Sequence, residues 1–95
     1  MSSYTIESIL FSLQSDPDFM ARFKADPEAS IRDYPLRDDE RQAILDWDVR
    51  AMSDAGVSAM LLMVAFTALN GQQAMPDYMR RMNMPPLRQI ASVTA

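Results

Sequence analysis

Apolar residues recur at helical spacing from the start of the chain. In the first segment they occupy Ile6, Ile9, Leu10 and Leu13. Steps of three and four residues place all of them on one face of a helix. The pattern predicts an amphipathic helix over residues 4–14, with Ser3 as its N-cap.

Two Asp-Pro pairs mark the starts of the next two expected helices. Asp16 precedes Pro17, and Asp26 precedes Pro27. An aspartate side chain accepts hydrogen bonds from the first helical turn, and proline suits the first helical position because its missing N–H would have no partner there. We therefore expect two short helices. Their apolar residues are Phe19, Met20, Phe23, Ile31 and Tyr34.

A longer helix is expected over residues 38–55. Three carboxylates stand at its start, where the helix dipole favours negative charge, and Gly56 suits the left-handed position that ends many helices. At about 100° per residue, its apolar residues share one broad arc. They are Ile44, Leu45, Trp47, Val49, Ala51, Met52 and Ala55.

Asp48 falls inside this apolar arc. A carboxylate there is costly unless it is paired or accepts backbone hydrogen bonds. We favour a structural role, in which Asp48 caps a neighbouring helix or pairs with an arginine such as Arg41. The alternative is a polar contact to a partner or a ligand.

The segment over residues 58–69 has no polar face. Its apolar residues are Met60, Leu61, Leu62, Met63, Val64, Ala65, Phe66 and Leu69. A helix that is apolar all round must be covered all round. Two interpretations stay open: the helix is the centre of the domain, or a second protein covers part of it.

The rest of the chain is a short helix and a tail. Pro76 and Asp77 open a helix that contains Tyr78, Met79 and Met82, and two prolines end it. The tail shows no helical pattern and a mild strand preference.

A chain of 95 residues has room for one domain. We expect an all-α domain over residues 1–86, a small bundle of five to six short helices. An irregular, extended C-terminal tail over residues 87–95 should follow it.

Composition excludes most self-contained catalytic sites. The chain has no histidine and no cysteine. It therefore cannot build a zinc finger, an iron–sulfur site, a 2-His-1-carboxylate iron site or a histidine-activated nucleophile, and it can form no disulfide. It also lacks a glycine-rich phosphate loop. We expect no bound cofactor or metal and no catalysis by this chain alone.

Charge and hydropathy limit the kinds of partner and the location that we expect for this chain. The net charge is −4, which argues against nucleic acid as a partner. The longest apolar run, over residues 57–69, is shorter than the roughly 20 residues of a membrane span, and the N-terminus does not resemble a signal peptide. We therefore expect no membrane partner and a cytoplasmic location.

The C-terminal half has the features of a contact surface. It contains most of the methionines, a residue type favoured at adaptable surfaces, and residues 57–95 carry a net charge of +2 against −6 for residues 1–56. A methionine cluster is equally consistent with a core. Arg80 and Arg81 could bind an anion, although two arginines on a short exposed helix are usually solvated.

Together, these residues resemble the LigA family, the small α subunits of protocatechuate 4,5-dioxygenase-type extradiol enzymes. The resemblance spans about residues 19–82. It rests on the block Phe-Met-Ala-Arg-Phe-Lys-Ala-Asp-Pro-Glu-Ala over residues 19–29, and then on Tyr34, Leu36, Asp39, Glu40, Ala43, Ile44, Leu45, Asp48, Ala51, Met52, Gly56 and the apolar helix that ends at Gly71.

The resemblance implies a role in a heteromeric enzyme. In this family the catalytic β subunit supplies the Fe(II), its histidines and the general base, and the α subunit packs over it and helps to close the pocket where a catecholic ring is opened with both atoms of O2. The expected partner is thus a LigB-like β subunit in an α2β2 heterotetramer. Residues expected at the interface or pocket lid are Met60, Met63, Phe66, Tyr78, Met79 and Met82, with Met63 and Phe66 facing the pocket.

The sequence departs from the family pattern at two places. Arg37 stands where the family has a Ser or Thr cap, so we expect capping to shift to Asp38. The segment after Gly71 is short, so no substrate contact is carried over.

The domain also resembles the precursors of split borosins, in which a partner methyltransferase would N-methylate the backbone of the tail at residues 87–95. We favour the dioxygenase subunit over this alternative and over a helical adaptor without an enzyme partner.

Overall fold

The computed structural model describes residues 2–87 and residue 90, and within them it contains helices and no strands. The all-α prediction is therefore confirmed. The seven α-helices and one 3-10 turn are α1 (Ser2–Ser15), α2 (Pro17–Ala25), α3 (Pro27–Ser30), α4 (Asp38–Leu45), α5 (Val49–Asp54), α6 (Ala59–Asn70), η1 (Gln72–Ala74) and α7 (Met75–Asn83).

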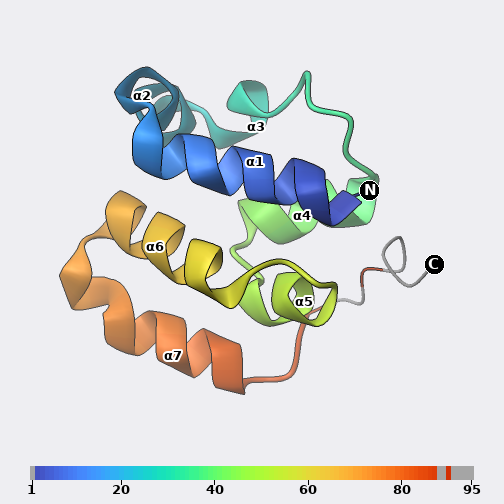
Figure 1. The fold of residues 1–95 in the computed structure, drawn as a ribbon, viewed down its shortest axis with the longest axis vertical. Coiled ribbons are helices and arrows are strands. Elements are labelled where there is room, and N and C mark those ends of the chain that lie inside the picture. The colour runs from blue at the N-terminus through green and yellow to red at the C-terminus, as the bar shows by residue number, and fades with distance from the viewer. Residues whose placement is uncertain (1, 88–89, 91–95) are drawn as a thin grey trace.

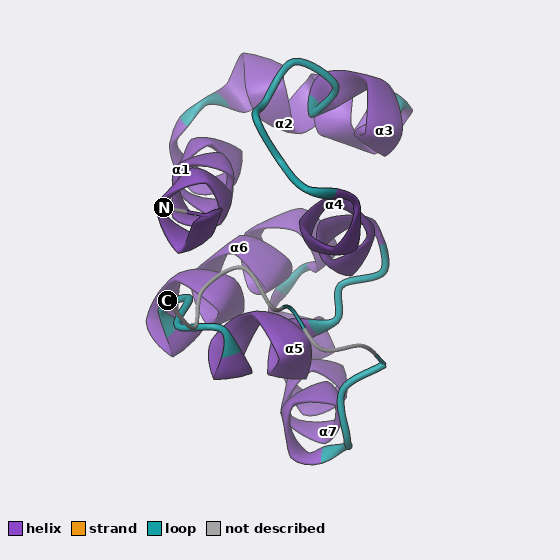
Figure 2. Cartoon of the chain, turned by 90° about the vertical axis from the view of Figure 1, so that its right-hand side faces the viewer, coloured by secondary structure: helices purple, strands orange, loops and turns teal. Residues whose placement is uncertain are grey.

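The apolar helix α6 lies at the centre of the arrangement, with α1 along one side and α7 along the other (Figure 1). Helices α2 and α3 cover the end of the molecule near α1, and α5 packs against α7 (Figure 2). One apolar cluster joins these elements and includes residues from α1, α2, α4, α5, α6 and α7. The central position of α6 agrees with the first of the two interpretations. The second, that another protein covers part of α6, stays a prediction.

Local rules explain where the first helices begin. The Asp16 carboxylate accepts the N–H groups of Asp18 and Phe19, and Asp26 accepts that of Ala29, as the two Asp-Pro pairs predicted. The cap at Ser3 is wrong, because α1 begins at Ser2 and already includes it.

The start of α4 also differs from the expectation. Asp38 is the first helical residue rather than the cap. The carboxylate of Glu40 reaches back to accept the N–H of Arg37 at 2.7 Å, and Asp39 accepts the N–H of Glu40 at 2.8 Å. Asp39 thus accepts the N–H that an N-cap side chain would otherwise accept, and Glu40 accepts the N–H of the N-cap residue itself.

The predicted helix over residues 38–55 is wrong in its continuity: it is divided into α4 and α5. Trp47 has φ of +52°, the left-handed conformation that glycine usually supplies after a helix. Its N–H donates to the Ile44 carbonyl, and the Asp48 N–H donates to the Ala43 carbonyl, which is the Schellman pattern. A bulky residue in this conformation costs about 1–2 kcal/mol, so contacts from elsewhere must offset it.

Candidate functional site

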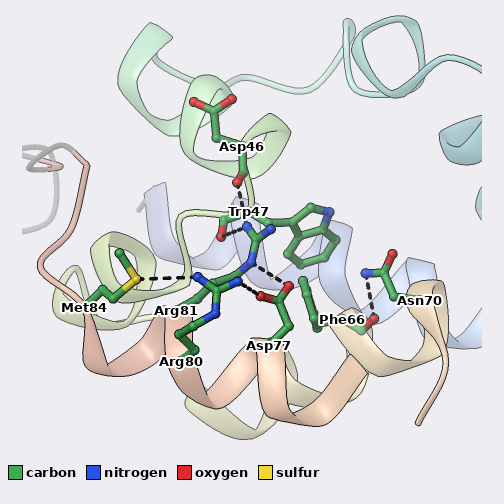
Figure 3. A network of polar contacts seen from close by, with 8 residues as sticks. All are labelled: Asp46, Trp47, Phe66, Asn70, Asp77, Arg80, Arg81 and Met84. Carbon is green, nitrogen blue, oxygen red and sulfur yellow. Dashed lines mark hydrogen bonds and ion pairs between the residues drawn. The ribbon is translucent and has the colours of Figure 1, made fainter. Parts of the chain in front are cut away.

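The turn between α4 and α5 is held by Arg81 of α7 (Figure 3). Its guanidinium donates to the carbonyl oxygens of Asp46 and Trp47 at 3.2 and 3.3 Å. Its Nε donates to the Asp77 carboxylate at 3.0 Å, and the group lies 5.5 Å from the centre of the Phe66 ring. The expectation that Arg81 is merely solvated is therefore wrong. Its role depends on a partner 34 residues away, which no local pattern reveals.

The Trp47 ring is held between two phenylalanines. It meets Phe66 edge-on at 5.4 Å between ring centres and Phe23 in the same manner at 6.3 Å. These contacts belong to a continuous row of rings across the molecule, made up of Tyr34, Phe19, Phe23, Trp47, Phe66 and Tyr78. Such pairs contribute beyond their buried area, so the row joins α2, the α4–α5 turn, α6 and α7.

Trp47 lines two recesses. The smaller has a volume of about 180 Å³ and is formed by Asp46, Trp47, Asp48, Val49, Arg80, Arg81, Met84, Pro85 and Leu87. The larger, of about 440 Å³, is formed by Phe23, Lys24, Pro27, Leu45, Trp47, Leu69 and Asn70. The conformation of this single residue therefore shapes the surface in both places.

Asp77 pairs with two arginines that line the smaller recess, Arg80 and Arg81. The hydrogen bond from Arg81 lowers the pKa of the Asp77 carboxyl below its ordinary value of 3.8, and the positive charges of Arg81 and Arg80 act in the same direction. Arg80 pairs with the same carboxylate. Asp77 therefore stays ionised at neutral pH, and it orients the Arg81 guanidinium toward the turn.

Asp48 has a structural position at the start of α5. Its side chain is 6% exposed. One carboxylate oxygen accepts the N–H of Ala51 and the other accepts the N–H of Leu87 at 3.0 Å. Arg41, named as a possible ion partner, donates instead to the carbonyls of Ile31 and Tyr34. Asp48 thus caps α5 and holds the beginning of the C-terminal segment.

The six residues expected at a partner interface divide into two groups. Met60 is 71% and Met79 51% exposed, while Met63 and Met82 are half-buried. Phe66 and Tyr78 are 3% and 4% exposed and belong to the apolar core of this chain. The expected role of the six residues at an interface or pocket lid stays a prediction. The sequence could not separate the groups, because an all-apolar helix does not indicate which side faces inward.

Tyr78 is anchored as well as buried. Its hydroxyl donates to the Ala59 carbonyl at 3.0 Å, which links α7 to the first turn of α6. Burial raises the pKa of the Tyr78 hydroxyl above its ordinary value of 10.0.

The residues of this chain do not fit an iron site. The sequence has no histidine or cysteine, and no group of three acidic side chains among the described residues could hold a metal ion. In the same part of the chain, no helix has the length and apolar character needed to cross a membrane.

The C-terminal tail lies mostly outside the described residues, so its predicted extended form is not observed. Of the two described positions in it, Leu87 is bonded to Asp48 and Ile90 is 4% exposed. Ile90 is part of the apolar cluster. A methyltransferase acting at this position would have to withdraw it from the core.

Comparison with protein families gave one finding. The family model described as "Aromatic-ring-opening dioxygenase LigAB, LigA subunit" matches residues 6–89. Comparison with curated proteins found no match, and comparison with solved structures found none either. The matched range includes every helix from α2 to α7 and most of α1.

Proposed function

This chain belongs to the LigA family, the small subunits of the aromatic-ring-opening dioxygenase LigAB, and on that basis we propose that it is the non-catalytic α subunit of a heteromeric, Fe(II)-dependent extradiol dioxygenase. The match over residues 6–89 is the observation that carries this proposal. The catalytic partner would be a LigB-like β subunit in an α2β2 heterotetramer. The proposed location is the cytoplasm.

The residue types in this chain indicate which subunit would hold the iron. Iron in ring-opening oxygenases needs imidazole and carboxylate ligands with open positions for substrate and oxygen, and this chain has no imidazole. The ligands and the chemistry would therefore belong to the β subunit. The α subunit would contribute packing and exclusion of water over the site where a catecholic ring is opened.

The exposed methionines support an interface on α6 and α7. Met60 and Met79 present large apolar side chains to solvent, and half-buried Met63 and Met82 lie on the same two helices. Methionine adapts its shape to a partner surface. We propose these four residues as the contact with the β subunit.

A reconstitution experiment tests the proposed activity. The chain purified alone should bind no iron and cleave no catechol. Mixed with the histidine-bearing partner, it should form a stable complex whose mass, measured by light scattering, corresponds to α2β2, and it should raise ring cleavage above that of the partner alone. Ring cleavage by the isolated chain would refute the proposal.

Single substitutions test the interface. Met60→Asp places a charge at an exposed position and should leave the isolated chain folded while weakening the complex at least tenfold, because the charge would be buried without a partner on assembly. Phe11→Asp is the matched control, since Phe11 is exposed on α1, outside the proposed contact. If Phe11→Asp weakens the complex and Met60→Asp does not, the contact lies on α1 instead.

A further inference from the structure

The turn between α4 and α5 satisfies backbone groups that a continuous helix would pair internally. In such a helix the carbonyls of Asp46 and Trp47 would accept the N–H groups of Arg50 and Ala51. Here Arg81 donates to both carbonyls instead. The Ala51 N–H is taken by the Asp48 side chain. The Trp47 carbonyl also accepts the Val49 N–H at 2.9 Å. Two side chains and one local backbone bond therefore replace the helical partners at this position.

The periodicity of the sequence favours the opposite arrangement. Apolar residues keep one arc across the turn at helical spacing, and no glycine or proline stands within residues 38–55. The left-handed conformation of Trp47 is also unfavourable for a bulky side chain. Two local backbone hydrogen bonds close the turn, from Trp47 to Ile44 and from Asp48 to Ala43, and the contacts made by α7 add to them across the fold.

The contacts with α7 and with the segment after it join parts of the chain that are distant in sequence. Arg81 is oriented by Asp77 on its own helix, and Asp48 also holds the N–H of Leu87, just beyond α7. Arg50, one residue into α5, donates to the Met82 carbonyl near the end of α7. Any displacement of α7 relative to α5 would therefore act directly on the turn.

We propose that the α4–α5 turn is a conformational latch: Arg81 holds Trp47 in its left-handed state, and withdrawal of Arg81 lets Trp47 relax to the right-handed conformation that the sequence pattern favours. Because Trp47 lines both recesses, the latch couples the position of α7 to the shape of the surface on either side of this residue. The proposal concerns the isolated chain and does not rest on the proposed enzymatic role.

The chain offers a clean test because Trp47 is its only tryptophan. In the full-length Arg81→Gln variant, the Trp47 emission should shift to longer wavelength. The strong intraresidue NOE between the amide and α protons, which marks positive φ, should be lost at Trp47. Circular dichroism should show that the other helices remain.

Arg80→Gln is the matched control. Arg80 pairs with the same Asp77 carboxylate but makes no bond to the turn carbonyls. Its variant should keep the emission and the NOE of the parent chain. An equal change in both variants would show that lost positive charge, not the latch, is responsible, and would overturn the proposal.

Asp77→Asn decides the matter if Arg81→Gln does not fold. It leaves the Arg81 side chain in place but weakens the ion pair that orients it. A partial emission shift with a weakened NOE supports the latch. A Trp47 that keeps positive φ and unchanged emission in a folded Arg81→Gln would show that the turn does not need Arg81. The same result in Asp77→Asn would show that the turn does not need Arg81 oriented by Asp77. Either result would overturn the proposal.

Discussion

The Glu7 carboxylate accepts a hydrogen bond from the Ser58 backbone N–H at 2.9 Å. Ser58 is itself the N-cap of α6, and its hydroxyl accepts the Leu61 N–H. One side chain of α1 thus fixes the residue at which the central helix begins. This link spans 51 positions of the chain, so it belongs to the tertiary structure and not to local helix formation.

Glu7→Ala should destabilise the fold by about 1.5 kcal/mol, because a partly buried N–H loses a charged acceptor. Urea unfolding followed by Trp47 fluorescence measures the change. Glu28→Ala is the control, since Glu28 is exposed in the short helix α3, and it should alter the unfolding free energy by less than about 0.5 kcal/mol. Equal effects of the two substitutions would contradict a specific role for Glu7.

Tyr78 predicts loss of stability in alkaline solution. Its pKa is raised above 10.0 in the folded chain by burial, so the neutral hydroxyl is favoured in the folded state. The contribution of Tyr78 to stability is complete below pH 10 and declines as pH rises from there through the raised pKa. Unfolding free energies measured between pH 8 and pH 11, values set by the ordinary tyrosine range, should therefore fall at the upper end.

Tyr78→Phe should reduce this alkaline decline. At neutral pH it should cost about 1 kcal/mol, because the Ala59 carbonyl loses its donor. Tyr4→Phe, at an exposed position of α1, should change neither quantity. A decline that persists in Tyr78→Phe would assign it to another group.

Asp48→Ala should cost about 2 kcal/mol, since it removes the cap of α5 and the acceptor of the Leu87 N–H together. Thermal unfolding measures the loss. Hydrogen exchange should locate it at the amides of Ala51 and Leu87. Asp33→Ala, at an exposed site, is the control. Unchanged protection at both amides would show that the carboxylate does not hold them.

Leu62 and Met60 separate the two sides of α6. Leu62→Ala should lower the unfolding free energy by about 3 kcal/mol, because Leu62 is completely buried and leaves a cavity. Met60→Ala should change it by less than about 0.5 kcal/mol, because Met60 is exposed. Similar losses for both would mean that Met60 is buried in solution, for example by self-association, which sedimentation would detect.

Helix starts were predictable where the signal is local. The Asp16 and Asp26 caps need only the residues that follow them, so the sequence was sufficient. The division of α4 from α5 was not predicted, although Asp48 inside an apolar arc was a sign of it: a carboxylate that is unfavourable mid-helix becomes favourable as an N-cap.

The candidate interface was predictable only in part. Residue type singled out the methionines, but the exposed Met60 and the buried Phe66 stand on one helix whose faces are equally apolar. The sequence does not predict the role of Arg81, because its partners, the carbonyls of Asp46 and Trp47, lie on another element. Such pairings depend on how helices pack, which periodicity does not encode.

The sequence by itself determined the all-α fold class of the described residues and the lack of histidine and cysteine for metal chemistry, and its motifs pointed to the LigA family. Those properties depend on composition and on interactions within a few residues. Only the tertiary structure decided that Trp47 turns the chain between two helices and that Phe66 and Tyr78 face inward. These outcomes result from burial and hydrogen bonds between distant segments, whose free energies exceed the local conformational preferences they oppose.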